Sequence, residues 1–275
     1  MAENCCYDRT EMLILNMVRQ GVLGELLLAE CGYMHDLRSL LFGNDGEGLW
    51  RLAHVIERNG DLYPTHGLGP VAQWLNINRG NRFTRLVSMG TQSLGLNLYA
   101  AQHFGPESAE ARQRYAQSDI VTTLLQTEQG QTVQIKHDTA SPRPYSRGIL
   151  AQGTLGIVRK YPEEKVHLEG RSAPEMWEPL EAYQEEFEHP LWKQTLETLT
   201  GVGGHGNMDY LVDYRLTQCL RAGVPPDIDV YDAATWSAVS ALSAQSIANG
   251  SQAVDFPDFT RGGWKEREPL GIVNA

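Results

Sequence analysis

The chain has 275 residues, of which 41% are hydrophobic and 21% are charged, and its formal net charge is −11. That composition is typical of a globular protein that buries one substantial core or two small ones. The acidic balance, without any basic block, argues against a nucleic-acid partner and against an anionic membrane surface. No apolar run approaches the roughly 20 residues that a membrane span needs.

The start of the chain and its cysteines carry no targeting or metal signal. The first twelve residues, MAENCCYDRTEM, lack a basic start followed by an apolar core, so we expect no signal peptide in this chain. The four cysteines lack metal-ligand spacing and are too few for a disulfide framework, so we expect free thiols at Cys5, Cys6, Cys31 and Cys219.

Hydrophobic spacing predicts the elements of the first half of the chain. Apolar residues recur at helical spacing over Arg9–Gln20, and Gly21 suits the C-terminal cap of that helix. The run ELLLAECGY predicts a strand over Glu25–Tyr33. A helix over His66–Asn76 and a strand over Thr84–Met89 follow.

The second half begins with strands and ends with helices. Two runs flank a Glu-Gln-Gly-Gln turn and predict an antiparallel hairpin over Asp119–Gln126 and Thr132–His137. The acidic stretch Pro174–Glu188 is predicted as a solvated helix or an insertion. Further strands are expected at Gly148–Gln152, Leu155–Arg159 and Lys165–Leu168, and the two strongest helical patterns lie at Asn207–Arg221 and Val230–Asn249.

This order of elements predicts an α+β fold. Consecutive strands favour an open, mostly antiparallel sheet with helices against one face. We expect residues 1–275 to form a single domain. The other face of the sheet needs a cover, which we expect from a second subunit, giving a homo-oligomer, or from the acidic stretch.

A glycine-rich segment imitates a dinucleotide-binding motif. Residues 201–206, GVGGHG, satisfy G-x-G-x-x-G. That motif requires a preceding buried strand, whereas the preceding LWKQTLETLT is helical in pattern. We therefore interpret the segment as a loop that positions His205 and the following helix.

Two groups of residues are candidates for chemistry. Tyr7 precedes the first helix and is either a base or a partly buried core tyrosine. In the segment Tyr63-Pro64-Thr65-His66, the histidine starts a helix and is either a neutral proton-transfer group or only a helix cap.

Other candidates are more scattered. Arg51 follows Trp50, a pairing that suits carbohydrate but also occurs in surface ion pairs, and Tyr145 lies in a loop after the hairpin. The histidines at positions 35, 66, 137 and 205, with the acids near them, are candidates for a scattered metal site. No HxxxH, HxH or CxxC spacing supports one, so we assign no metal.

Distinctive segments run through most of the chain: ENCCYDR, GYMHDLR, ERNGDLYPTHGLGP, INRGNR, HDT, RPY, HPLW, GGHGNMDY, DVYDAATW and DFPDF. Together they resemble glycoside hydrolase family 109. The family lies in the glucose–fructose oxidoreductase-like group, whose members join an N-terminal Rossmann domain to a C-terminal domain with an open, largely antiparallel sheet. Its known activity is that of an NAD-dependent α-N-acetylgalactosaminidase.

The resemblance implies a mechanism and a set of residues. In the family, NAD oxidises the sugar at C3, a base removes the C2 proton, the C1 group is eliminated, water adds and the hydride returns. By matched position, Tyr7 is the C2 base and His66 assists proton transfer at the C3 hydroxyl. Asn4 and Tyr63 contact the nicotinamide end of NAD, and the sugar-contacting residues are Tyr33, Arg51, Tyr63, Pro64, Thr65, His66 and Tyr145.

One departure from the family pattern leaves alternatives open. Nothing in the chain matches the family's nucleotide-binding turn, so we expect the N-terminal NAD-binding domain to be absent from this chain and NAD to bind weakly without it. The alternatives to the glycosidase are a non-catalytic sugar-binding or oligomerisation module, and a cofactor-free lyase that acts on oxidised sugars through Tyr7 and His66.

Overall fold

The computed structural model describes residues 1–43, 46–196 and 205–274. Within these residues one nine-stranded sheet has the order β8-β7-β6-β5-β1-β4-β3-β2-β9. Only the pair β1 and β4 is parallel, and the other described pairs are antiparallel. The strands are β1 Leu26–Met34, β2 Phe83–Gly90, β3 Ile120–Thr127, β4 Thr132–Asp138, β5 Leu150–Gly153, β6 Gly156–Arg159, β7 Lys165–Leu168, β8 Glu178–Pro179 and β9 Val254–Asp255.

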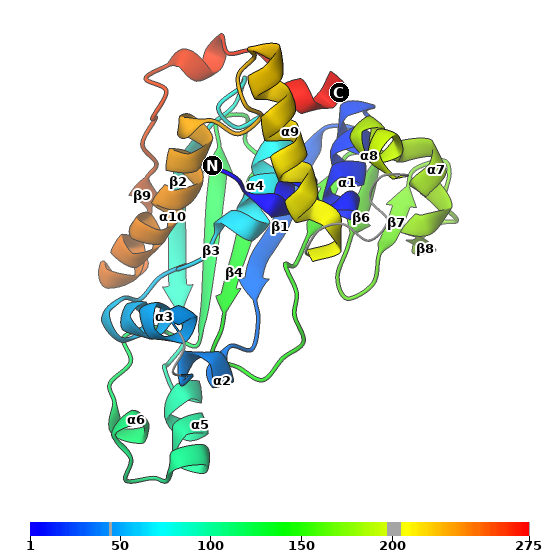
Figure 1. Ribbon diagram of the computed structural model, residues 1–275. Helices are drawn as coiled ribbons and strands as arrows, with labels where there is room; N and C mark the ends of the chain where they lie inside the picture. Colours follow the sequence, from blue (N-terminus) through cyan, green and yellow to red (C-terminus); the bar gives the residue numbers. More distant parts are fainter. Residues whose placement is uncertain (44–45, 197–204, 275) are drawn as a thin grey trace.

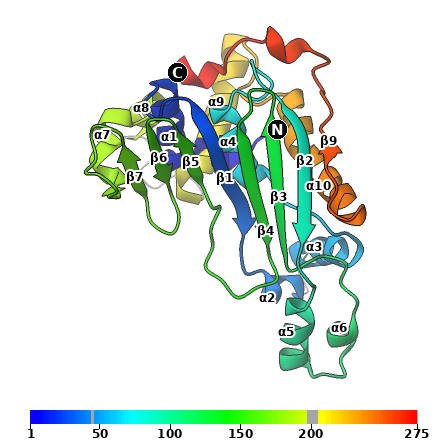
Figure 2. The same cartoon turned by 180° about the vertical axis from the view of Figure 1, so that it is seen from behind.

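The long helices cover one face of this sheet. In Figure 1 helices α1, α4, α9 and α10 lie in front of the strands, and in Figure 2 the strands lie in front of them. The predicted open, mostly antiparallel sheet with helices on one face is therefore confirmed. The helices are α1 Arg9–Arg19, α2 Arg38–Leu41, α3 Gly46–Glu57, α4 Thr65–Trp74, α5 Gly95–Phe104, α6 Ala109–Arg112, α7 Gln184–Phe187, α8 Pro190–Thr195, α9 Met208–Ala222 and α10 Val230–Ala248.

Side-chain alternation places the core between the sheet and these helices. On β3, Val121 and Leu125 are fully buried, whereas Leu124 between them is 45% exposed. Met89 of β2 is likewise 66% exposed. Because successive side chains of a strand point to opposite faces, these apolar groups belong to a sheet face that no described helix covers.

The acidic stretch differs from its prediction. Its residues form the edge strand β8, a short 3-10 helix over Leu180–Tyr183, and α7, rather than a solvated helix. Leu180, Tyr183 and Phe187 are buried in the main core. The stretch therefore extends the sheet edge and supplies core side chains, because its apolar residues are spaced so that all three face inward.

Four helices at one end of the sheet were not predicted. They are α2, α3, α5 and α6, which Figure 1 shows below the strand ends. Helices α2 and α6 have only four residues each, too few for a periodic signal. Among the described helices, none combines the length and the hydropathy needed to cross a bilayer.

Candidate functional site

The site lies where the parallel pair β1 and β4 ends and helix α4 begins. Tyr33 of β1 and His137 of β4 are paired residues, so their side chains stand next to each other on the helix-covered face. Helix α4 starts against this pair, since a Cβ atom added at Gly67 would lie 2.5 Å from the backbone nitrogen of Gly32. Only glycine permits this approach, which brings His66 to Tyr33.

Four predicted residues form one aromatic cluster, which we define as Tyr33, Tyr63, His66 and Tyr145. The ring centroids of Tyr33 and Tyr63 are 4.6 Å apart, and those of Tyr63 and His66 are 4.8 Å apart. Tyr33 also lies 5.7 Å from His66 and 6.4 Å from Tyr145. The structure thus brings together residues that are more than one hundred positions apart in the sequence.

A buried carboxylate orients His66. Its Nδ1 lies 2.7 Å from Oε1 of Glu3, which is only 5% exposed. Burial alone would raise the pKa of Glu3, but the hydrogen bond and charge of His66 outweigh it and hold the pKa below its usual value. Because an ionised carboxylate only accepts hydrogen bonds, Nδ1 carries the hydrogen directed at Glu3, and Nε2 is the ring nitrogen left for a ligand.

The neighbours of His66 in its segment fix the start of the helix. Pro64 is the N-cap residue of α4, and its carbonyl accepts from Leu68. Thr65 is the first helical residue, and its side chain also lowers the pKa of Glu3 by a hydrogen bond. These two residues therefore position the histidine and its partner.

Arg51 reaches the cluster from helix α3. Its guanidinium carbon lies 5.2 Å from the ring centroid of Tyr63 and 4.5 Å from that of Trp50. Glu47 pairs with it at 2.9 Å. The guanidinium of Arg51 therefore pairs with Glu47 and also lies over the ring of Tyr63, and it has further N–H groups that can donate to a ligand.

Tyr145 is held by a buried ion network, which we define as Asp8, Glu11, Arg147 and Lys160. Nη1 of Arg147 donates to the Tyr145 hydroxyl at 3.3 Å. Arg147 also pairs with Glu11 and, at 2.7 Å, with Asp8, while Lys160 contacts both carboxylates. Burial raises the pKa of Tyr145, and the nearby Arg147 charge opposes that rise.

Tyr7 does not join the cluster. It is 3% exposed, and its hydroxyl donates to Oδ2 of Asp227 at 3.1 Å. Burial and the charge of Asp227 raise its pKa well above the usual value. Within the described residues no hydrogen bond, ion pair or ring contact links Tyr7 to the cluster, so the geometry does not favour the base role that the resemblance implies.

Asn4 offers a group that fits an amide-bearing cofactor. Its Nδ2 donates to Asp209 at 2.6 Å, whereas its buried Oδ1 has no partner among the described residues. His205 contacts the same Asp209 at 2.7 Å. The hydrogen bonds from Asn4 and His205 lower the pKa of Asp209, and the charges of His205 and His66 lower it further. His205 therefore flanks the site, while residues 201–204 of the glycine-rich segment lie outside the described residues.

One group of possible metal ligands overlaps the cluster. Donor atoms of Glu3, Cys5 and His66 lie within 4.8 Å of one another. Burial raises the pKa of the Cys5 thiol far above its usual value, and Glu3 and His66 already bind each other. A protonated thiol is a poor ligand, so this donor set favours a hydrogen-bonded pair.

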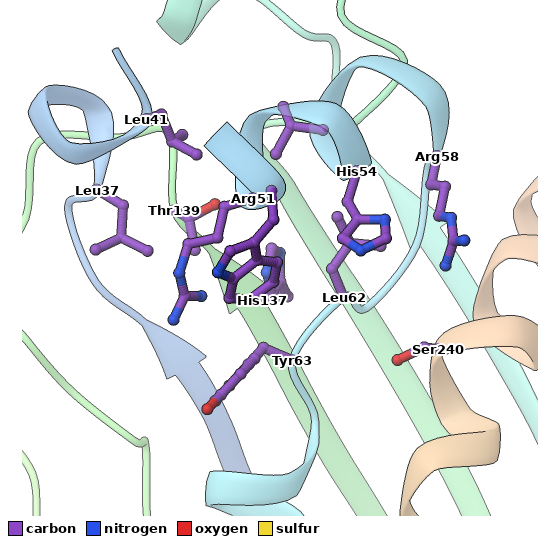
Figure 3. Close-up of a pocket in the computed structure, with 12 residues that line it drawn as sticks. Leu37, Leu41, Arg51, His54, Arg58, Leu62, Tyr63, His137, Thr139 and Ser240 are labelled. Carbon is purple, nitrogen blue, oxygen red and sulfur yellow. The ribbon is translucent and has the colours of Figure 1, made fainter. Parts of the chain in front are cut away.

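A pocket of about 280 Å³ adjoins the cluster and shares Arg51 and Tyr63 with it. Figure 3 shows Arg51, His54 and Arg58 extending from the α3 side toward Tyr63 and Ser240. The remaining lining residues are Leu37, Leu41, Trp50, Val55, Leu62, His137 and Thr139. Sequence reasoning named neither this pocket nor Glu3 and Arg147, although Glu3 belongs to the ENCCYDR segment.

The structure resembles solved sugar oxidoreductases. An inositol dehydrogenase homolog from Azotobacter vinelandii, complexed with NAD+, aligns with a TM-score of 0.62 and 16% identity over 93% of this chain and 64% of that one. A levoglucosan dehydrogenase complexed with NADH and levoglucosan aligns with a TM-score of 0.58, 16% identity, 92% of this chain and 65% of that one. At this identity the likeness shows the fold, which is that of the glucose–fructose oxidoreductase-like group.

Sequence relatives give the family. A glycosyl hydrolase family 109 protein of Solibacter usitatus is 48% identical over 98% of this chain and 61% of its own length. One of Stenotrophomonas maltophilia is 45% identical over 98% of the chain and 63% of its length. The chain thus spans about three fifths of these relatives. The model of the glycosyl hydrolase 109 C-terminal domain matches residues 7–266, and the chain therefore belongs to glycosyl hydrolase family 109.

Proposed function

We propose that this chain forms the sugar-binding and proton-transfer part of an NAD-dependent α-N-acetylgalactosaminidase. The observation that carries the proposal is the convergence of the aromatic cluster, whose contacting rings are 4.6 to 6.4 Å apart. Aromatic faces stack on the apolar faces of a pyranose ring. The guanidinium of Arg51, placed over Tyr63, supplies donors for its hydroxyls.

The cofactor would be held at the edge formed by Asn4 and Tyr63. When bound there, NAD would supply reversible hydride transfer at C3 of the sugar. The unpartnered Oδ1 of Asn4 suits the N–H of the nicotinamide carboxamide. Adenosine and phosphate contacts are not assigned to described residues of this chain.

His66 is the residue we assign to the C3 hydroxyl. Its Nε2 accepts the hydroxyl proton as the C3 carbon is oxidised, and Glu3 stabilises the imidazolium that forms. The bond at 2.7 Å fixes both the tautomer and the ring orientation. This arrangement is the general one of a carboxylate that orients a histidine base.

We assign the C2 proton to Tyr33. Its hydroxyl lies 3.5 Å from Nδ1 of His35, whose pKa is lowered by burial and by the Arg51 charge, so that the ring is neutral and accepts. Burial raises the pKa of Tyr33 to about 12, and Arg51 opposes the rise. A 3-keto sugar has an acidic C2 proton, which Tyr33 removes as its own hydroxyl proton passes to Nδ1 of His35. Tyr7, which donates to Asp227, lacks such a free acceptor.

The test is hydrolysis of an aryl α-N-acetylgalactosaminide in D₂O, with and without NAD, by the chain alone and by the chain joined to the remaining part of a relative. We expect NAD-dependent release and deuterium at C2 of the product, and a loss of at least about a hundredfold in His66→Gln and Tyr33→Phe. Tyr99→Phe is the control outside the cluster. Hydrolysis without C2 deuteration would contradict the proposal, and sugar binding without turnover would favour a non-catalytic module.

We also propose that the uncovered sheet face binds a second copy of the chain. Met89 and Leu124 are 66% and 45% exposed there. Exposed apolar groups on an open sheet face favour association with another protein surface. The acidic stretch forms β8 at one edge of the sheet, whereas Met89 and Leu124 belong to β2 and β3 near the other edge.

A further inference from the structure

The proposed reaction still lacks a group that protonates the oxygen departing from C1. In that reaction His66 serves the C3 hydroxyl and Tyr33 removes the C2 proton, but the bond between C1 and the leaving group must also break. An alkoxide is a poor leaving group, so a proton donor placed beside C1 lowers the barrier to this step. Such a donor should lie next to Tyr33, on the side away from His66.

Tyr145 occupies this position in the aromatic cluster. The ring centroid of Tyr33 lies 5.7 Å from that of His66 and 6.4 Å from that of Tyr145. Within the described residues no ring contact joins Tyr145 to His66, so Tyr33 lies between them. The order Tyr145, Tyr33, His66 therefore matches the order C1, C2, C3 along a pyranose ring.

Tyr145 also lies at the open end of the aromatic cluster. It is 39% exposed, whereas Tyr33 is 7% exposed. The group attached to C1 is often larger than the sugar itself, and it has to leave toward solvent. The exposed end lets this group depart while the sugar ring stays against the other aromatic side chains.

Arg147 determines the direction of the Tyr145 hydroxyl. Its Nη1 donates to the hydroxyl oxygen at 3.3 Å. A guanidinium has donors but no acceptor, so the single hydrogen of the hydroxyl has to point elsewhere. In the described part of the chain the Tyr145 hydroxyl donates to no other group, which leaves its hydrogen available to a ligand.

The buried ion network holds Arg147 in place for this contact. The Arg147 side chain is 3% exposed, and it pairs with Glu11 and, at 2.7 Å, with Asp8. Burial raises the pKa of Tyr145, and the charge and hydrogen bond of Arg147 lower it. A donor fixed in this way stabilises the negative charge that develops on the tyrosine oxygen as its proton is transferred.

We propose that Tyr145 is the general acid that protonates the oxygen leaving C1, and that Arg147 is its positioning residue. This inference rests on the proposed function. After C2 loses its proton, the electron pair left there forms a C1–C2 double bond, the C1–O bond breaks, and the leaving oxygen takes the hydroxyl proton of Tyr145. Water then adds at C1, giving one proton to the Tyr145 phenolate, and C2 recovers a proton through Tyr33.

The experiment uses methyl and 4-nitrophenyl α-N-acetylgalactosaminides that already carry a keto group at C3. These substrates need no hydride transfer, so the chain is assayed by itself, in D₂O, against the uncatalysed reaction. We measure the release of methanol or 4-nitrophenol, and the exchange of deuterium into C2 of the unreacted methyl glycoside. Methoxide needs a proton to leave, whereas 4-nitrophenolate leaves without one.

Tyr145→Phe keeps the ring and removes only the hydroxyl. It should slow methanol release by about a hundredfold or more, slow nitrophenol release by less than about tenfold, and leave C2 exchange nearly unchanged. Arg147→Lys should give the same pattern with a smaller loss, because the ammonium keeps the charge but not the fixed fork of donors. The matched control is Tyr161→Phe. Tyr161 also lies beside Arg147, with 6.0 Å between the guanidinium carbon and the ring centroid, and its variant should change neither release.

The outcomes separate the two proposals. If the wild-type chain neither exchanges C2 nor releases either leaving group, the proposed function fails and this inference fails with it. If the wild type exchanges C2 but Tyr145→Phe slows both releases equally, the sugar site stands and the general acid is refuted. A loss confined to the methyl glycoside in Tyr161→Phe, with Tyr145→Phe unaffected, would also refute it.

Discussion

Asp61 opens the segment that leads into the aromatic cluster, and its carboxyl group is buried with little compensation. It is 1% exposed, and its Oδ1 accepts from the backbone nitrogen of Tyr63 at 3.3 Å. Its Oδ2 has no partner among the described residues. Burial raises the pKa of Asp61 from 3.8 to about 7, and the hydrogen bond from the Tyr63 backbone lowers it by a smaller amount.

The raised pKa of Asp61 determines whether the free energy of unfolding rises or falls with pH. The folded protein keeps a proton on Asp61 that the unfolded chain releases near pH 4. The group therefore contributes stability that is fully present below pH 3.8 and is lost as the pH rises through about 7. A difference of about 3 pKa units corresponds to about 4 kcal/mol, lost at about 1.4 kcal/mol per pH unit.

Asp61→Asn imitates the protonated carboxyl and should abolish this loss. Urea unfolding followed by tryptophan fluorescence from pH 5 to 8.5 measures the difference between variant and wild type. We expect the variant's advantage to grow by about 1.4 kcal/mol per pH unit and to level off above pH 7. The control is Asp36→Asn, since Asp36 is partly exposed, is bonded to Arg38 and should contribute less than about 1 kcal/mol. Parallel pH profiles for Asp61→Asn and wild type would refute the reasoning.

Three further predictions concern other parts of the molecule. Arg147→Met should lower the free energy of unfolding by about 3–5 kcal/mol, because it leaves Glu11 buried with one cation fewer. The control Arg171→Ala breaks an exposed ion pair and should cost less than about 1 kcal/mol. Equal losses in urea unfolding would contradict this prediction. Tyr7→Phe removes only the hydrogen bond to Asp227, so kcat/KM should stay within a few-fold of wild type and the free energy of unfolding should fall by about 1 kcal/mol. A hundredfold loss of turnover would instead identify Tyr7 as the base. Leu124→Arg should convert a dimer into a monomer in sedimentation velocity, and a wild-type chain that already sediments as a monomer would rule out the sheet-face interface.

Local sequence patterns predicted the strands and long helices well. Alternation located the hairpin of β3 and β4, and Gly223, with φ of +66°, ends α9 as a cap. The parallel pairing of β1 with β4 was not predictable, because nothing local specifies which distant strand a strand will join. Helix α3 was missed although Leu52, Val55 and Ile56 have helical spacing, since glycines surround its first turn.

The site depended on a different kind of information. Periodicity gave no reason for Tyr33 and Tyr145 to meet, and only the family resemblance selected them. That resemblance also selected Tyr7, whose burial and bond to Asp227 depend on a turn more than two hundred residues away. Glu3 acts through burial and its bond to His66, and His137 is buried with Nδ1 unpartnered among the described residues; a sequence displays neither.

The pairing of Tyr33 with His137 makes the site depend on strand parity. Inserting one residue into β4 after Ile135 would turn His137 to the uncovered face, while Tyr33 would stay in place. Inserting two residues would return the side chain to the covered face. Insertion of one residue should therefore weaken sugar binding more than insertion of two, although neither insertion changes the identity of a side chain in the site.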